Sequence, residues 1–143
     1  MFVKQLSVFI ENRAGRLAAA CRALAEEDIN IVALSLADTA DFGILHLIVS
    51  DPDLAYDTLK EAGFTLIGND VIAVEVEDKP GGLLKILEVL QEGSINVEYM
   101  YAFSSVVTKR AALIFRFEDS EAAIKALGAA GIGVMNKVDV LGE

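Results

Sequence analysis

LSVFIENRAGRLAAACRALAEEDIN at residues 6–30 and IAVEVEDKPGGLLKILEVLQEGSIN at residues 72–96 are two versions of one segment. Each begins by alternating apolar and polar residues, which is typical of a strand with one buried face. Each continues with apolar residues at helical spacing, such as Leu17, Ala20 and Leu24 in the first version, which predicts an amphipathic helix. The versions align without a gap at a shift of 66 residues, so the sequence predicts a duplicated strand–helix unit.

Beyond this segment the alignment continues at a shift of 68 residues, which matches Asp51 with Asp119 and Gly63 with Gly131. The second copy therefore has two extra residues, for which we expect a place at a hairpin tip. The aspartates are good helix N-caps, and the glycines suit the residue that follows a helix. The remaining apolar stretches predict strands at residues 29–37, 43–49 and 64–67 of the first copy, and at residues 95–103 and 111–117 of the second.

Each copy thus has the order strand, helix, strand, strand, helix, strand. This order predicts an α+β fold of two ferredoxin-like βαββαβ repeats, each an antiparallel four-stranded sheet with helices on one face. We expect the first repeat at residues 1–67 and the second at residues 71–143, joined by a turn at residues 68–70, Gly-Asn-Asp. Residues 44–49 are apolar on both faces of a strand. We therefore expect the other repeat or another subunit, as in a homodimer, to cover the second face of the sheet.

Composition and charge disfavour several classes of function. The chain of 143 residues has a formal net charge of −10, which opposes binding to phosphate backbones and anionic lipid surfaces. No apolar run approaches the ~18 residues that cross a membrane, and the first residues do not resemble an export signal. Cys21 is the only cysteine, so the chain has no intramolecular disulfide and no cysteine cluster for a metal. We expect a cytoplasmic protein with neither a nucleic-acid nor a membrane partner.

The most informative loops join the first strand of each copy to its first helix. A helix N-terminus presents unpaired backbone N–H groups and a partial positive charge, and glycine lets a ligand approach the backbone closely. Such a loop can therefore receive a carboxylate. We expect ligand binding at Asn12, Arg13, Ala14, Gly15, Arg16 and Leu17 in the first copy, and at Asp78, Lys79, Pro80, Gly81, Gly82 and Leu83 in the second.

These residues resemble the ACT domain, whose repeats have an Asn-Arg-Pro-Gly-like loop after the first strand and an Ile-Asn-Ile-like step into the second. The matching segments are NRAG (12–15), INI (29–31), DKPG (78–81) and INV (95–97). In amino-acid-controlled enzymes such as the serine-sensitive phosphoglycerate dehydrogenases, both asparagines of this pattern contact the effector. The resemblance therefore implies that Asn12 binds the effector and that the step into the second strand contributes Asn30 and Ile31, with Asn96 and Val97 as their counterparts.

The chain departs from the ACT pattern at two loop positions. Ala14 replaces the proline in the first copy, and Asp78 replaces the asparagine in the second. A carboxylate only accepts hydrogen bonds, so Asp78 suits an ammonium group and repels a carboxylate. The resemblance implies a stand-alone tandem ACT protein that binds a free amino acid or similar small effector near the interface of the repeats and controls a regulated enzyme or transporter. We expect affinities between micromolar and millimolar.

Few residues of the sequence support an enzyme or an RNA-binding protein. His46 and Cys21 are the only side chains that titrate close to neutrality, and both fall at apolar positions, so we expect structural roles, no enzyme activity, no metal and no cofactor. Tyr99, Tyr101 and Phe103 alternate along one strand as in RNA-binding sheets, but the acidic charge favours an interface or core role. The alternative to effector binding is a structural, partner-docking dimerisation module without a ligand.

Overall fold

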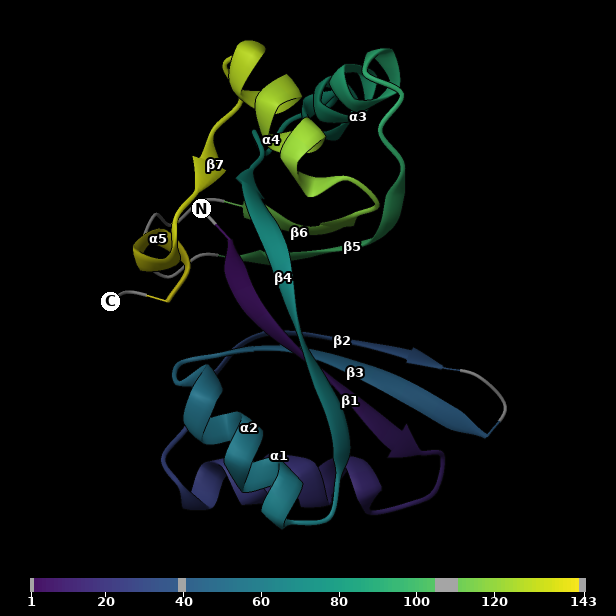
Figure 1. Ribbon diagram of the computed structural model, residues 1–143, viewed down its shortest axis with the longest axis vertical. Coiled ribbons are helices and arrows are strands. Elements are labelled where there is room, and N and C mark those ends of the chain that lie inside the picture. The colour runs from purple at the N-terminus through teal and green to yellow at the C-terminus, as the bar shows by residue number, and fades with distance from the viewer. Residues whose placement is uncertain (1, 39–40, 105–110, 142–143) are drawn as a thin grey trace. The chain divides into compact units, whose positions relative to one another are not determined.

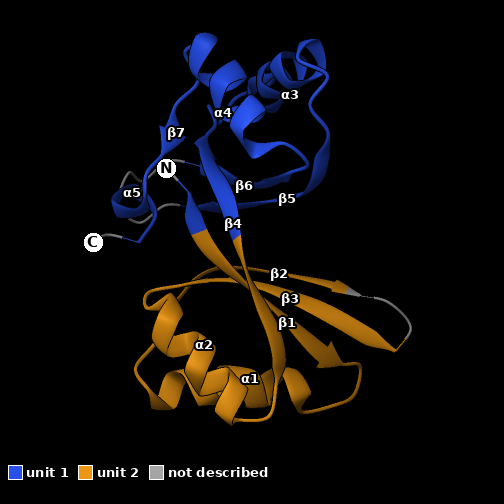
Figure 2. Ribbon diagram, in the orientation of Figure 1, with its two compact units in different colours: residues 1–3, 70–143 blue, residues 4–69 orange. Residues whose placement is uncertain are grey.

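The computed structural model describes residues 2–38, 41–104 and 111–141 (Figure 1). The chain forms two compact units (Figure 2). Residues 4–69 make the N-terminal unit, drawn in orange, and residues 70–143 with residues 1–3 make the C-terminal unit, drawn in blue. The hairpin tip predicted to hold the extra residues of the second copy lies outside the described residues.

The N-terminal unit has a four-stranded sheet in the order β2-β3-β1-β4, with two helices on one face (Figure 1). β3 pairs antiparallel with β1 and with β2, so that Leu47 faces Leu6 on one side and Leu34 on the other. The elements are β1 (Val3–Glu11), α1 (Arg16–Glu26), β2 (Ile31–Asp38), β3 (Phe42–Val49), α2 (Pro52–Glu61) and the first part of β4 (Thr65–Glu75). The predicted βαββαβ order is confirmed.

The C-terminal unit repeats this arrangement with the sheet order β7-β4-β6-β5. β4 pairs antiparallel with β6 and with β7, so that Val74 faces Leu113 on one side and Val134 on the other. The elements after β4 are α3 (Gly82–Glu92), β5 (Val97–Ser104), β6 (Ala111–Phe117), α4 (Ser120–Ala129), β7 (Val134–Met135) and α5 (Lys137–Leu141). The last strand is only two residues long and is followed by the short helix α5, which the sequence analysis did not predict.

Each unit has its own hydrophobic core between the sheet and its helices. In the N-terminal unit, Leu6, Val8 and Ile10 point from β1 into a cluster with α1 and α2, as the alternation in the sequence predicted. In the C-terminal unit, Ile72 and Val74 do the same from β4. Full burial of each such side chain contributes about 1.5–3 kcal/mol, so the repeated pattern supplies most of the driving force for each repeat.

The four long helices begin in two different ways. The side chains of Asp51 and Asp119 accept hydrogen bonds from the backbone amides of Leu54 and Ala122, at 3.2 and 3.1 Å, and so cap α2 and α4. In contrast, α1 and α3 begin after Gly15 and Gly81, neither of which supplies a side-chain cap. The second helix of each repeat thus satisfies its own N-terminus, whereas the first helix does not.

The expected turn between the repeats is wrong. Gly68, Asn69 and Asp70 continue the strand β4 instead of reversing the chain. Turn propensity is a local preference, and here the backbone hydrogen bonds of a sheet outweigh it. The side chain of Asn69 contributes to this outcome, because its Oδ1 atom accepts a hydrogen bond of 2.9 Å from the hydroxyl group of Ser7.

The start of α3 gives a test of local packing. Replacement of Gly82 by alanine should destabilise the protein by roughly 1–3 kcal/mol, because a Cβ atom there overlaps the carbonyl oxygen of Glu77. Gly128→Ala in α4 is the matched control, since a Cβ atom at Gly128 meets no atom within 4 Å. The control should stabilise the helix by roughly 0.5–1 kcal/mol. Urea denaturation measures both, and equal effects of the two substitutions would contradict the geometry.

Candidate functional site

The two strand-to-helix loops have nearly the same backbone conformation. Gly15 and Gly81 have φ angles of 88° and 87°, in the left-handed region that glycine adopts without strain. In each loop a backbone amide donates a hydrogen bond to the carbonyl oxygen of the glutamate two residues before it. Arg13 N donates to Glu11 O at 2.8 Å, and Lys79 N donates to Glu77 O at 2.9 Å. The predicted correspondence of the two loops therefore extends to their hydrogen bonds.

The N-terminal ends of α1 and α3 are suited to binding an anion. Neither helix has a side-chain cap or an acidic residue in its first turn, whereas α2 and α4 carry Asp53 and Glu121 there. The first amides of a helix have no partner within the helix, and the helix dipole places a partial positive charge on them. A carboxylate or another anion can therefore be bound at these two ends.

A cleft of about 740 Å³ lies beside the second loop, within the C-terminal unit. One wall comes from the end of β4 and the start of α3, and the other from the segment between α4 and β7. Apolar side chains and glycines alternate with charged groups along the walls. The lining residues are Glu75, Val76, Glu77, Asp78, Lys79, Pro80, Gly81, Gly82, Lys85, Ile86, Ala111, Gly131, Ile132 and Gly133.

The segment from Gly131 to Gly133 is held in place by backbone hydrogen bonds. Ile132 N donates to Leu127 O at 3.0 Å, which closes the end of α4 around Gly131 with its φ angle of 74°. Gly133 O then accepts a hydrogen bond of 3.1 Å from Glu75 N. The far wall of the cleft is therefore fixed to the near wall by main-chain bonds, so the cleft is part of the fold.

Acidic groups outnumber basic groups in the cleft. Glu75, Glu77 and Asp78 face Lys79 and Lys85 among the lining residues. Lys79 Nζ lies 2.7 Å from a carboxylate oxygen of Glu77, and this hydrogen bond, followed by the Coulombic attraction of the same carboxylate, raises the pKa of Lys79. The pair is exposed to solvent, so it contributes little to stability. This ion pair places one acidic and one basic side chain at the cleft.

The first loop is arranged differently. Glu11 lies 3.3 Å from Arg13 Nε and 3.9 Å from Arg16 Nε. The guanidinium group of Arg16 lies over the ring of Phe64, with 4.6 Å between its central carbon and the ring centroid. Arg16 is half-buried, and its Nε atom is buried without a hydrogen-bond partner. The side chain of Arg16 therefore packs on Phe64 and lies near Glu11.

The structure does not bring the two asparagines of each repeat together. Asn12 N donates to Asp41 O at 3.0 Å, next to the first residue of β3. Asn30 O accepts a hydrogen bond from Ser50 N, just beyond the last residue of β3, and Asn30 N donates to the side-chain hydroxyl of Ser50. Asn96 O likewise accepts from Glu118 N, just beyond β6. Asp41 and Ser50 flank the eight residues of β3 and are nine positions apart, which is roughly 30 Å of strand. One amino acid cannot contact Asn12 and Asn30 of the same unit.

The cleft contains part of the predicted site and several residues that the sequence analysis missed. Of the predicted residues in the second repeat, those from Asp78 to Gly82 line the cleft, while Leu83, Asn96 and Val97 are not among its lining. The missed residues include Lys85 on α3 and the segment from Gly131 to Gly133. The βαββαβ topology was the available signal, because it places the ends of the first strand and of the second helix at the same edge of a repeat.

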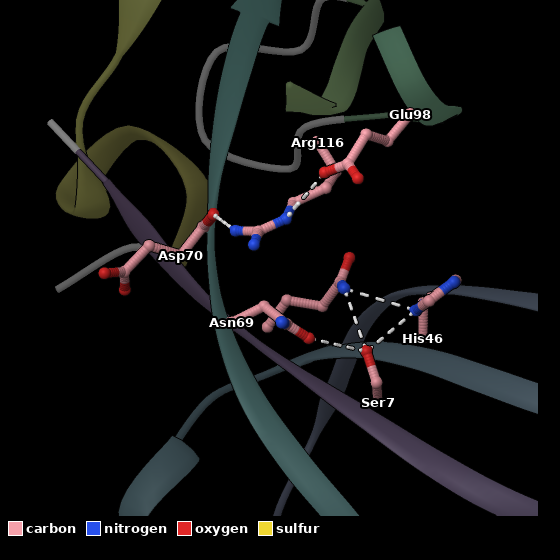
Figure 3. Close-up of polar contacts among 7 residues, drawn as sticks. Ser7, His46, Asn69, Asp70, Glu98 and Arg116 are labelled. Atoms are coloured by element: carbon pink, nitrogen blue, oxygen red, sulfur yellow. Dashed lines mark hydrogen bonds and ion pairs between the residues drawn. The ribbon is translucent and has the colours of Figure 1, made fainter. Parts of the chain in front are cut away.

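His46 belongs to a buried polar cluster in the N-terminal unit (Figure 3). Ser7 Oγ donates to Asn69 Oδ1 at 2.9 Å and accepts a hydrogen bond from Gln5 Nε2 at 3.2 Å. Ser7 Oγ also lies 3.0 Å from His46 Nδ1. Gln5 Nε2 lies 3.2 Å from the same nitrogen of His46. His46 thus satisfies buried polar groups, in agreement with a structural role.

The other residues that the sequence singled out, Cys21, Tyr99 and Tyr101, are partly buried within the fold. Cys21 is half-buried, less than its predicted core position implies. Tyr99 and Tyr101 are half-buried on the edge strand β5, and burial, followed by the charge of Tyr99, raises the pKa of Tyr101. Arg116 Nη1 donates to Asp70 O at 2.9 Å and its Nε lies 3.4 Å from Glu98 (Figure 3). Within the described residues, no group of three His, Cys, Asp or Glu side chains is placed to hold a metal ion.

The fold and the paired loops define a tandem ferredoxin-like protein with a ligand-sized cleft. The family described as an ACT domain pair matches residues 1–140, so the chain belongs to that family. A crystal structure of a protein from Bacteroides thetaiotaomicron is 38% identical, with a TM-score of 0.92, and the match covers 99% of this chain and 96% of that one. No curated protein matches the chain.

Two more distant solved structures share the fold. The regulatory subunit of aspartate kinase from Thermus thermophilus, in a ligand-free form, is 19% identical with a TM-score of 0.63, over 89% of this chain and 91% of that one. The corresponding subunit from Thermus flavus is 21% identical with a TM-score of 0.60, over 90% and 92%. None of the helices in the described residues combines the length and the apolar character that a membrane crossing requires.

The buried histidine predicts a pH dependence of stability. Burial lowers the pKa of His46 below its usual value of 6.5. As the pH falls below 6.5, the unfolded chain therefore binds a proton that the folded chain does not, and the free energy of unfolding decreases. His46→Gln keeps a hydrogen-bonding side chain but does not titrate, so it should remove this loss between pH 6.5 and about pH 5, above the range of ordinary carboxylates. Parallel urea denaturation curves across this range measure the difference, and identical pH profiles would show that His46 is not responsible.

Proposed function

We propose that this protein is a regulatory module that binds a free amino acid or a similar small effector, and that it is not itself an enzyme. The effector binds at the loop between the first strand and first helix of a repeat. The observation that carries the proposal is the cleft of about 740 Å³ beside Gly81, at the start of a helix without a cap. Its volume falls in the ~300–1,000 Å³ range of small-molecule sites.

The chemistry of the cleft suits a zwitterion. The backbone amides at the start of α3 and of the adjacent glycines can donate hydrogen bonds to a carboxylate. The acidic residues Glu75, Glu77 and Asp78 attract an ammonium group. Val76, Ile86 and Ile132 provide apolar surface for a side chain. Two or three charge-assisted hydrogen bonds contribute roughly 4–8 kcal/mol, which corresponds to affinities between millimolar and micromolar.

The comparisons support a regulatory role. The chain belongs to the ACT domain-pair family, and two solved structures of the same fold are regulatory subunits of aspartate kinase. By this similarity the effector signal passes to a partner, an enzyme or a transporter, and the chain acts as a homodimer. A cytoplasmic location, favoured by the single cysteine, belongs to the same proposal.

A second function is favoured by one apolar surface of the N-terminal unit. Leu34 and Leu36 lie on the edge strand β2 and are 55% and 46% exposed. Exposed apolar side chains beside an open strand edge are suited to pairing with another chain. Under this alternative, the protein is a docking or dimerisation module without a ligand. Ligand binding separates the two functions.

A screen of the twenty amino acids by thermal shift tests effector binding. A ligand that binds the native state at 100 times its dissociation constant adds about 2.7 kcal/mol of stability. For a chain of this size, we expect the melting temperature to rise by roughly 5–10 °C for at least one amino acid. Isothermal titration calorimetry of each positive amino acid provides the control for indirect effects. If no amino acid shifts the transition or produces heat at millimolar concentration, the docking module is the correct function.

The asparagines of the first repeat allow a separate test. Asn12→Ala and Asn30→Ala remove side chains whose backbones are hydrogen-bonded at opposite ends of β3. Under the implied role of Asn12, its substitution should weaken one effector site by about tenfold, the loss of one good hydrogen bond. Asn30→Ala should leave that site unchanged if one unit forms it alone.

A combined loss has a clear structural meaning. If both substitutions weaken the same ligand, the two side chains must come from different copies of the chain, because the length of β3 separates them within one unit. Sedimentation equilibrium with and without the ligand then shows whether the site requires a dimer. No effect of either substitution would remove the first loop from the site.

A further inference from the structure

The charged side chains that line the cleft of the C-terminal unit fall into two groups. Glu77 forms its ion pair of 2.7 Å with Lys79, and Glu75 also takes part in an interaction of its own. In contrast, Lys85 and Asp78 form neither an ion pair nor a side-chain hydrogen bond with any described residue, and so do not pair with each other. The cleft therefore has one basic and one acidic side chain that are available to a ligand.

These two side chains belong to the same wall of the cleft. Gly82 N donates to Lys79 O at 3.0 Å, and Lys85 N donates to Gly81 O at 3.1 Å. The two bonds join the loop that contains Asp78 to the first turn of α3. A helical side chain is directed back toward the N-terminus of its helix, so Lys85 extends toward this loop.

Lys85 occupies a position where a helix disfavours a cation. It is the fourth residue of α3, close to the partial positive charge of the helix N-terminus. The matching residues of the first repeat are uncharged, with Ala19 in place of Lys85 and Asn12 in place of Asp78. No partner within the described residues offsets the unfavourable position of Lys85, whereas a bound carboxylate would.

We propose that Lys85 and Asp78 recognise the two charged groups of a neutral α-amino acid with an aliphatic side chain. Lys85 binds the carboxylate of this ligand, and Asp78 binds its ammonium group. This inference rests on the proposed function and names the ligand class and the specificity-determining residues of that site.

The remaining lining of the cleft determines which side chain the ligand carries. Ile86 belongs to the hydrophobic core of the C-terminal unit, and Val76 and Ile132 pack against that core. All three also line the cleft and can contact an apolar side chain. Once the ligand's main-chain groups occupy Lys85 and Asp78, no lining residue offers a free partner for a third charge. A charged ligand side chain would therefore lose hydration without compensation.

Analogues of one amino acid test the ligand class. We expect L-leucine to bind the full chain in isothermal titration calorimetry. L-leucinamide lacks the carboxylate and isocaproate lacks the ammonium group, so each should bind about tenfold more weakly or worse. Tighter binding of either analogue, or of a charged or polar amino acid, than of L-leucine overturns the inferred class but leaves the proposed function intact. Absence of binding by all twenty amino acids removes both.

Two substitutions assign the charged groups separately. Lys85→Gln should weaken L-leucine about tenfold and change the affinity for L-leucinamide by less than about twofold, because that analogue has no carboxylate. Asp78→Asn should weaken both of these ligands and leave isocaproate unchanged. Lys125→Gln in α4 and Asp57→Asn in α2 are the matched controls, since both residues are exposed and neither lines the cleft. The controls should bind all three ligands normally.

The pattern across ligands distinguishes recognition from an indirect effect on the fold. Lys85 and Asp78 are exposed, so we expect both variants to fold, which circular dichroism checks. The melting temperature of Lys85→Gln without ligand should not fall, because the substitution removes a cation from the start of a helix. Unchanged affinity for L-leucine in either variant overturns the role of that residue. An equal loss for all three ligands overturns the assignment of the two groups.

Discussion

A glycine with positive φ at the start of the first helix is the constraint on which each repeat's loop depends. Gly15 and Gly81 lie immediately before the two helices, and in each turn a backbone amide donates to the carbonyl oxygen of the glutamate two residues before it. This turn leaves no room in the sequence for a capping side chain, so the helix end stays available to an external group. The second helix of each repeat, capped by aspartate, has no such function.

Duplication followed by divergence explains why two similar loops have different surroundings. The hydrogen bonds of the two turns are the same, so the backbone has been retained. The side chains that face the adjacent space have not. Arg16 and Phe64 contact each other in the first repeat, while Gly82 and Ile132 line a cleft in the second.

Much of the fold followed from the sequence because the repeats confirm each other. Alternation in β1 and β4, helical spacing in α1 and α3, and the aspartate caps all describe local preferences that agree with the final packing. The turn expected at residues 68–70 failed because the sheet imposes its own hydrogen bonds on a locally weak strand. The glycines of the second loop identified it as a candidate site. The sequence did not identify the cleft wall at Gly131, because a local pattern does not show which loops distant in the sequence lie together.

The positions of the asparagines show a second limit of the sequence. Asn12 and Asn30 were linked through the resemblance to ACT domains, and nothing in the linear pattern shows that a full strand separates them. Distances between loops depend on strand length and direction, which become definite only when the sheet order is known. The contact of Arg16 with Phe64 could not be predicted either, because a charged residue at the start of a helix is usually exposed.

The most direct measurement is the change in backbone amide chemical shifts of the ¹⁵N-labelled chain as the amino acid with the largest thermal shift is added. The account predicts that large changes occur at Gly81, Gly82, Gly131 and Gly133, the glycines on both walls of the cleft. A spectrum in which these four residues do not change at saturating ligand would contradict the claim that the glycine turn of the second repeat forms an open binding site.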